Sequence, residues 1–389
     1  MEPFAFQLPS RIVYGSGGFK EAGALAAELG KKALIVTHGS ARGKLLADRL
    51  TAILSDAGVE SAVFSGVVPN PTTESVNAGA EAAKSFGADM IVGLGGGSAL
   101  DSAKAVAIGA THPGEAWDYR LWQKPIDSAK VPPIFAITTT SGTGAEITAV
   151  SVVTRTDEHC KFALVDKSLH PRIALVDPEL TLSVPAHVTA ATGFDAYCHA
   201  FECTINKARN DYVDAQALFA MRLVVDNLEK AIASPDDLPA REALALANTV
   251  AGVCIANVGV TLPHGIGMAI GGSAPRVAHG EALAIIYPEI ARITWREAIP
   301  QYAAAARQMN PELVGVPDAE AAERAADGFS RFLNRIDLRI GLADKGVARE
   351  TLAVIAKDAF GLPDYGSHPV VLDEPAVLEL LNACYAVSG

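Results

Sequence analysis

The apolar and polar positions in the first half of the chain alternate between two patterns. Short apolar runs rich in β-branched residues predict buried strands, and stretches with apolar residues three and four positions apart predict helices. Strands that alternate with helices are typical of a parallel sheet with helices on both faces. We expect strands over 32–37, 61–67, 89–94, 133–138 and 173–176, and helices over about 41–57, from 71 onward, and over 99–110.

The segment 149–165 interrupts this rhythm with two β-rich runs around Thr156–His159, which predict a hairpin. After about Leu182 the apolar spacing favours helices throughout. We therefore predict an α/β N-terminal domain with a mostly parallel sheet over residues 1–182, and an all-α C-terminal domain over residues 183–389. The C-terminal helices are expected near 187–205, 211–233, 239–257, 281–308, 317–336, 347–358 and 374–386.

Composition and charge narrow the class of protein. The 389 residues carry a formal net charge of −12, which gives no general attraction for nucleic acid or for an anionic membrane surface. No apolar run is long enough to span a bilayer, and residues 1–11 lack the features of a signal peptide. The five cysteines are scattered and form no CxxC pair, so a cytoplasmic protein is expected.

A glycine-rich turn, Gly95–Ser98, lies between the third predicted strand and its helix. Glycines let the backbone approach a ligand closely, and a helix N-terminus directs N–H groups at an anion such as a pyrophosphate. The spacing is not that of G-x-G-x-x-G, and the turn follows the third strand rather than the first. A tight turn without a ligand therefore stays an alternative at this point.

A second loop, Thr138–Gly144, follows the fourth predicted strand and contains only small, hydroxylated or glycine residues. Such residues build no core but donate hydrogen bonds to ribose and phosphate, although a flexible surface loop has the same composition. Loops after neighbouring parallel strands meet at the carboxyl edge of the sheet, where open α/β folds bind ligands. The pair of loops favours a dinucleotide.

One carboxylate and three histidines form a candidate metal site. Asp195 and His199 are four residues apart on a predicted helix and therefore share a face. His264 and His279 each precede a glycine and interrupt helical runs, as residues at helix ends around a cleft would. A surface Asp–His pair and two unrelated loop histidines are the alternatives. One carboxylate and three imidazoles suit iron(II) or zinc and leave a position for substrate.

These motifs occur together in an order that resembles the iron-containing (group III) alcohol dehydrogenase family. The resemblance runs from residue 6 to at least Pro288. It rests on the segments Phe6–Gly15, Pro69–Thr72, Gly95–Ser98 with Asp101, Thr139–Glu146, Asp177–Thr181 and Gly193–Glu202.

The resemblance implies the dehydroquinate synthase-like fold, in which an α/β dinucleotide-binding domain precedes a helical metal-binding and substrate domain. It implies hydride transfer between NAD or NADP and a small primary alcohol or aldehyde on a divalent metal, iron(II) or zinc. It also implies a homodimer or a larger homo-oligomer. The implied metal ligands, which are also the catalytic residues, are Asp195, His199, His264 and His279. The implied cofactor contacts are His38, Asn70, Gly96, Gly97, Ser98, Asp101, Thr139, Thr140, Thr143 and Lys161.

The chain departs from the family's pattern at two positions. Many relatives carry a second histidine four residues after the third ligand, where this chain has Met268, so water or a ribose hydroxyl would have to take the proton. Many NAD-specific relatives carry an aspartate after the first strand, where this chain has His38, so NADP is not excluded, and Arg42 or Lys44 could help to bind it. Phe194, Cys254 and Met268 are expected at the substrate pocket.

Two other classes of function are compatible with parts of this pattern. A metal-dependent lyase like dehydroquinate synthase would use the nicotinamide only transiently, and a non-catalytic sensor would merely bind nucleotide. The hydroxylated loop and the Asp–His–His–His set favour the dehydrogenase over both alternatives.

Overall fold

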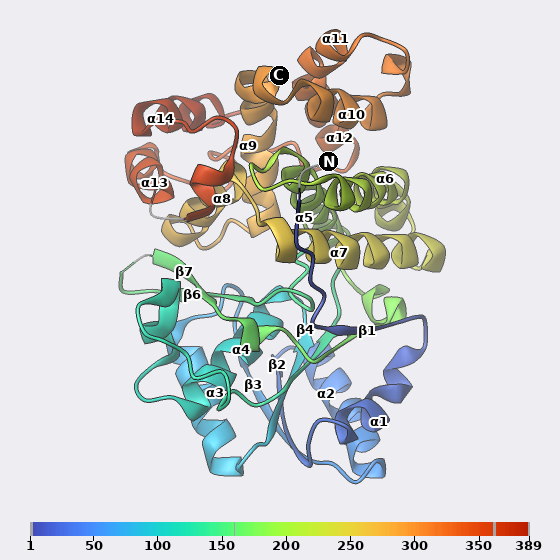
Figure 1. Ribbon diagram of the computed structural model, residues 1–389, viewed down its shortest axis with the longest axis vertical. Coiled ribbons are helices and arrows are strands. Elements are labelled where there is room, and N and C mark those ends of the chain that lie inside the picture. Colours follow the sequence, from blue (N-terminus) through green and yellow to red (C-terminus); the bar gives the residue numbers. More distant parts are fainter. Residues whose placement is uncertain (1–2, 159, 361–362, 388–389) are drawn as a thin grey trace. The chain divides into compact units, whose positions relative to one another are not determined.

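The computed structural model describes residues 3–158, 160–360 and 363–387. The chain divides into two compact units (Figure 1). One unit is Gln7–Leu182, and the other is Ser183–Gly389 together with the described residues that precede Gln7. The short N-terminal segment therefore belongs to the helical unit, where Phe4 and Phe6 pack against Tyr212.

The Gln7–Leu182 unit contains a six-stranded parallel sheet in the order β1-β8-β5-β4-β2-β3. Five strands match the predicted ones within one or two residues at each end. The strand β1, which pairs with β8, was not predicted from the pattern. The strands are β1 (Arg11–Tyr14), β2 (Lys32–His38), β3 (Glu60–Val67), β4 (Met90–Gly95), β5 (Ile134–Thr138) and β8 (Ile173–Val176).

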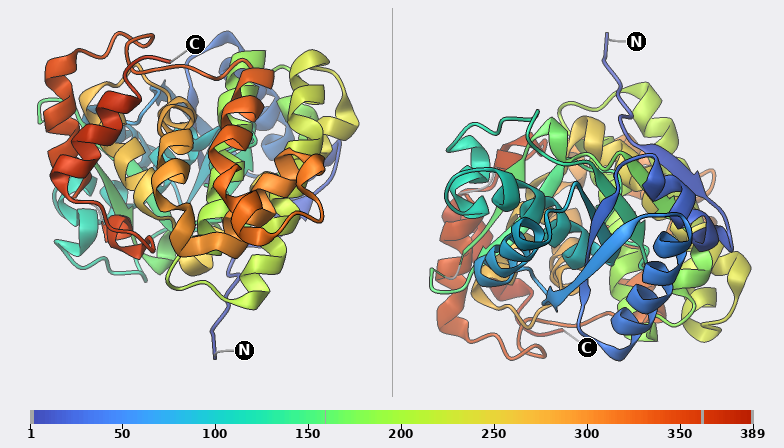
Figure 2. Two further views of the ribbon diagram at one scale, coloured as in Figure 1. Left: turned by 90° about the horizontal axis from the view of Figure 1, so that it is seen from above. Right: turned by 90° about the horizontal axis from the view of Figure 1, so that it is seen from below.

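Helices cover both faces of this sheet, as predicted (Figure 2). Alternate strand residues point to opposite faces, so Ala33 and Ile35 pack under α1 and α2 while Leu34 and Val36 pack under α3 and α4. Burying each large apolar side chain stabilises the fold by about 1.5–3 kcal/mol. The four helices are α1 (Ala22–Ala27), α2 (Ala41–Asp56), α3 (Thr73–Phe86) and α4 (Gly97–Thr111).

The predicted hairpin is present as β6 (Val150–Arg155) and β7 (Cys160–Val165), which pair in antiparallel register. His159, in the expected turn, lies outside the described residues. The hairpin is fixed on α4, because Val152 N donates to Asp101 Oδ2 at 3.1 Å and Ser151 Oγ donates to the Asp101 carbonyl at 2.7 Å.

The second unit is helical, as predicted, and its first three helices match the expected ranges closely. They are α5 (Ala186–Ile205), α6 (Asp211–Ala233) and α7 (Leu238–Val258). Side-chain N-caps stabilise the first turns of α6 and α7. Asn210 Oδ1 accepts from Val213 N at the start of α6, and Asp237 Oδ1 accepts from Ala240 N at the start of α7.

The helix α7 is long and apolar enough to cross a membrane by length and composition alone. Most of its apolar stretch is buried inside the unit, and it packs against α5 and α6. Its buried Arg241 donates to Thr189 Oγ1 at 2.8 Å and to the Val184 carbonyl at 3.3 Å. Such burial and such contacts are typical of a helix in the core of a folded unit.

Two predicted C-terminal helices are interrupted in the structure. The stretch 281–308 is α9 (His279–Thr294), a 3-10 turn over Trp295–Ala298, and α10 (Ile299–Met309). Pro300 lacks an N–H group and lies in the first turn of α10, where a helix loses no hydrogen bond to it. The stretch 317–336 is likewise two helices, α11 (Asp318–Glu323) and α12 (Ala325–Arg335). The last two helices are shorter than predicted: α13 (Leu352–Ala359) and α14 (Glu374–Ala383).

The glycine-rich stretch between the two later histidines is a helix, α8 (Leu262–Ser273), which the pattern did not predict. Glycine lowers helix propensity, but Leu262, Ile266 and Ile270 are four residues apart and are all fully buried. Tertiary packing of this apolar stripe therefore outweighs the weak local preference.

Candidate functional site

The helix α5 places Asp195 and His199 on one face. His199 Nδ1 lies 3.7 Å from Asp195 Oδ1, and both side chains are buried, with 7% and 3% of their surface exposed. The expected i,i+4 pair is therefore an interior pair rather than a surface one. A surface Asp–His pair, the alternative left open by the sequence, does not describe this geometry.

Two further helices bring the remaining histidines to the same aspartate. His264 is the third residue of α8, and His279 is the first residue of α9. His264 Nε2 lies 3.5 Å from Asp195 Oδ1, and His279 Nε2 lies 3.9 Å from it. The His264 ring stacks on the His199 ring with centroids 4.4 Å apart. The two histidines are presented at helix starts, as the sequence suggested.

The arrangement of these donor atoms fits a metal ion. One ligand atom each from Asp195, His199 and His264 lies within 4.8 Å of the other two. Asp195 Oδ1 and His264 Nε2 are buried and have no hydrogen-bond partner among the described residues. Buried polar atoms without partners are costly in a folded protein, so convergent ones mark a place for a missing partner. A carboxylate with imidazoles is a donor set for iron(II) or zinc.

The charged groups of the site favour a positive charge between them. Burial alone would raise the pKa of Asp195, but the imidazoles, that of His199 first, lower it to about 2. Burial opposes protonation of His264, yet Glu202 and Asp195 raise its pKa to about 10. Two buried carboxylates therefore favour cationic charge between them. A divalent cation supplies that charge in competition with protons.

Glu202 contacts the ring nitrogen of His264 that faces away from Asp195, a role that the sequence motif alone did not assign. The carboxylate is fully buried, and its Oε1 lies 2.6 Å from His264 Nδ1. Its Oε2 accepts from Thr261 N at 2.6 Å and from Thr261 Oγ1 at 2.9 Å. With Nδ1–H donated to Glu202, the Nε2 lone pair of His264 points into the site, as in other carboxylate–histidine–metal arrangements. Glu202 is seven residues after Asp195 on α5, and this spacing is the signal that could have identified it.

The two loops of the sheet unit contact each other directly. Thr139 N donates to the Gly95 carbonyl at 2.9 Å. A Cβ atom on Gly96 would lie 2.8 Å from Thr140 Oγ1, and one on Gly97 would lie 2.6 Å from Thr143 Cγ2. Only glycine fits against the hydroxylated loop here, so the close packing of the two loops is enough to explain the residue type.

The strand order explains why the glycine turn follows the third predicted strand. Apart from β1, the order β3-β2-β4-β5-β8 is that of the flavodoxin-like doubly wound sheet, in which the chain reverses direction between β2 and β4. Ligands bind outside the carboxyl ends of strands at such a switch point. Gly96 is the N-cap of α4 at that edge, and His38 ends the neighbouring β2.

Three other expected cofactor residues make contacts within the sheet unit. Lys161 Nζ donates to Asn70 Oδ1 at 3.1 Å, and Asn70 has a positive φ of 53°. Asp101 holds the hairpin, and burial raises its pKa to about 6 in spite of the nearby Lys104 ammonium. Asp101 is therefore already bound on one oxygen, Oδ2, by the backbone of β6.

Near the expected 2′ position, His38 ends β2, and Arg42 and Lys44, the two residues considered for binding a 2′-phosphate, have partners within the protein. Partial burial lowers the pKa of His38, which keeps its imidazole neutral near pH 7. The Arg42 guanidinium donates to the Leu180 carbonyl, and Lys44 Nζ lies 3.1 Å from Asp48 Oδ2. An exposed pair such as Lys44–Asp48 is weak and does not prevent Lys44 from binding an anion.

Two expected substrate-pocket residues are core residues instead. Phe194 is fully buried among Tyr197, Tyr287 and Phe332, and Cys254 is fully buried with its Sγ on the Val213 carbonyl. The expectation for both residues was wrong, because motif position alone does not show to which side of a helix a side chain points. Met268 is half-buried on α8.

Comparison with known proteins agrees with this geometry. Residues 9–178 match the family model described as iron-containing alcohol dehydrogenase, and residues 189–385 match that of the C-terminal domain of the same family. The NAD-dependent methanol dehydrogenase of Bacillus methanolicus is 35% identical over 91% of this chain and 93% of its own. The 1,3-propanediol dehydrogenase of Klebsiella pneumoniae is 34% identical over 98% of this chain and 99% of its own.

Solved structures show the same likeness over the whole fold. The crystal structure of the alcohol dehydrogenase ADH/D1, from an archaeal halo-thermophile of a Red Sea brine pool, has a TM-score of 0.92. It is 31% identical and covers 99% of both chains. The present chain belongs to the iron-containing alcohol dehydrogenase family. It is an oxidoreductase of the NAD(P)-dependent alcohol dehydrogenase type, and the family resemblance and the fold class predicted from the sequence are confirmed.

Proposed function

We propose that the chain oxidises small primary alcohols, and reduces the matching aldehydes, with Asp195, His199, His264 and His279 as ligands of one iron(II) ion. The observation that carries this proposal is the convergence of the three imidazoles on Asp195 Oδ1 within 3.9 Å. The same set suits zinc, and metal analysis of protein purified without oxygen distinguishes the two ions. The ion supplies Lewis acidity to an alcohol oxygen, and NAD(P) accepts or returns the hydride.

The protein's own residues would hold and orient the reactants. Glu202 fixes the ring of His264, and the buried surroundings of Asp195 strengthen every charge interaction at the site. Met268 is four residues after His264 on α8, and its thioether carries no proton, so a water molecule or a ribose hydroxyl takes the alcohol proton instead.

We propose that the loops at the carboxyl ends of β4 and β5 bind the dinucleotide. Gly96, Gly97 and Ser98 at the start of α4 would take the pyrophosphate, because helix N-termini attract anions. Thr139, Thr140 and Thr143 would donate to phosphate or ribose. The other expected contacts are His38, Asn70, Asp101 and Lys161. On this proposal the sheet unit, predicted as residues 1–182 and observed as Gln7–Leu182, is the dinucleotide-binding domain, and residues 183–389 form the metal and substrate domain.

The activity itself can be tested with short alcohols. Metal-loaded protein is expected to form NAD(P)H in proportion to the alcohol consumed, and to oxidise NAD(P)H with the matching aldehydes. Absorbance of the reduced nicotinamide measures both directions with NAD and with NADP. A lyase of the dehydroquinate synthase type would release no net NAD(P)H, and a sensor would show binding without turnover. Either result would reject the proposed dehydrogenase activity.

The end of β2 offers a test of cofactor choice. His38→Asp places a carboxylate where the neutral imidazole now ends the strand, and like charges at a binding surface are strongly unfavourable. We expect kcat/KM with NADP to fall by about tenfold or more while that with NAD changes little. His38→Asn is the matched control, since it changes the side chain without adding charge. Equal loss with both cofactors would show that His38 does not face the 2′ position.

We also propose a cytoplasmic homo-oligomer, a dimer or larger, without nucleic acid or membrane partners. All five cysteines are free thiols, which suits a reducing compartment. The net charge of −12 disfavours phosphate backbones and anionic lipid. The molar mass in solution, measured by light scattering, tests the assembly state.

A further inference from the structure

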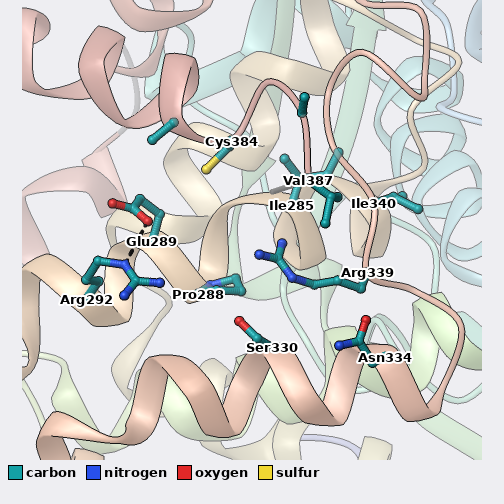
Figure 3. A pocket seen from close by; sticks show the side chains of 12 residues that line it. Ile285, Pro288, Glu289, Arg292, Ser330, Asn334, Arg339, Ile340, Cys384 and Val387 are labelled. Atoms are coloured by element: carbon teal, nitrogen blue, oxygen red, sulfur yellow. Dashed lines mark hydrogen bonds and ion pairs between the residues drawn. The ribbon is translucent and has the colours of Figure 1, made fainter. Parts of the chain in front are cut away.

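A pocket lies within the helical unit (Figure 3). Its volume is about 410 Å³, within the range of small-molecule sites. One wall is α9, with Ile285, Pro288 and Arg292, and another is α12, with Ser330. None of the four proposed metal ligands lines it.

The pocket is positively charged in a strongly acidic protein. Two guanidinium groups, those of Arg292 and Arg339, line it, and Figure 3 shows them directed from opposite sides toward Pro288. Glu289 is the only carboxylate among the described residues that line the pocket, and its Oε2 already lies 3.1 Å from Arg292 Nε. Arg339 forms no hydrogen bond or ion pair with any residue in the part of the chain that the structure describes. Among the described lining residues, positive charges therefore outnumber negative ones by one, and the unpaired charge is that of Arg339.

The remaining lining residues define what kind of ligand fits. Ile285, Ile340 and Val387 give an apolar wall, while Ser330 and Asn334 add a hydroxyl and an amide. Arginine recognises carboxylates and phosphates with two parallel N–H donors, and it does so best where water is partly excluded. We propose that this pocket binds a small organic anion, with its carboxylate or phosphate on Arg339 and a short apolar part against the wall. The metal site is not needed for this binding.

Calorimetric titration of the full-length protein tests the site, with butyl phosphate and hexanoate as separate probes. We expect one saturable site per chain, with equal affinity in metal-loaded and metal-stripped protein. The tighter probe identifies phosphate or carboxylate as the preferred group. Inorganic phosphate should bind several-fold more weakly than butyl phosphate, because it leaves the apolar wall bare. Absence of saturable binding of either probe at millimolar concentration would overturn the proposal.

Substitutions locate the binding within the pocket. Arg339→Ala is expected to weaken the tighter probe by about tenfold or more, since a charge-assisted bidentate contact is lost. Arg339→Lys keeps the charge but not the planar fork, and should give an intermediate loss. The matched control is Arg331→Ala, which removes an exposed arginine of α12 that does not line the pocket and should change nothing. Unchanged affinity in both Arg339 variants, or an equal loss in the control, would reject the assignment. Metal content, unaffected in every variant, separates this result from the fate of the dehydrogenase proposal.

Discussion

An Asp195→Ala protein is expected to lose bound metal and alcohol turnover together. Asp195 Oδ1 is the atom that the three imidazole nitrogens share, at 3.5–3.9 Å, and its removal leaves neutral ligands on three separate helix positions. Loss of a residue behind a metal ligand typically costs about 10- to 100-fold in metal affinity, so loss of a coordinating oxygen should cost more. Elemental analysis after dialysis and the rate of NAD(P)H formation measure the two losses.

Two companion variants make this result specific. Asp195→Asn keeps the size of the side chain but removes its charge, and should also fail to retain metal. Asp327→Ala removes an exposed carboxylate from α12 and should retain both metal and activity. A full metal load with wild-type turnover in Asp195→Ala would refute the ligand assignment. Circular dichroism shows whether each variant keeps its helices.

Replacing Glu202 by glutamine is expected to weaken metal binding without removing any ligand. The amide keeps the shape and can still accept from Thr261, but it no longer offers a negative oxygen to His264 Nδ1 at 2.6 Å. The histidine becomes a poorer and less firmly oriented ligand, and we expect metal affinity to fall by about 10- to 100-fold. Competition with a metal-binding dye measures this affinity independently of turnover.

Tyr287→Phe is the matched control for Glu202→Gln. Tyr287 OH donates to the same carboxylate oxygen at 3.3 Å and to the Cys198 carbonyl at 3.4 Å, so its loss removes two weak hydrogen bonds and no charge. Its metal affinity should stay near that of the parent. If Glu202→Gln binds metal as tightly as the parent does, Glu202 holds Thr261 in place and has no role at the metal.

The sequence predicts half of the metal site from local geometry alone. Asp195 and His199 are one helical turn apart, so a correct helix prediction places them together. His264 and His279 are 65 or more residues further along the chain, and no periodicity brings them to Asp195. Their glycine-flanked positions made them candidates, the family resemblance implied that they are ligands, and only the packing of α8 and α9 against α5 shows them beside the aspartate.

Long-range packing accounts for features that the local sequence pattern could not show. The glycines of α8 predict no helix, yet the helix forms because its apolar stripe is fully buried. Gly280 shows the same dependence, since a Cβ atom there would lie 2.0 Å from the Ala191 carbonyl oxygen. The glycine turn follows the third predicted strand rather than the first, and the strand order of the sheet explains this position because β4 lies beside β2.

The division of the proposed contacts between the two units has a consequence for how this enzyme can change. All four proposed metal ligands belong to the unit Ser183–Gly389, and all proposed dinucleotide contacts belong to Gln7–Leu182. The proposed metal ligands and the proposed dinucleotide contacts thus share no residue. We therefore expect that substitutions among the proposed dinucleotide contacts can change the cofactor preference without replacing any ligand of the metal.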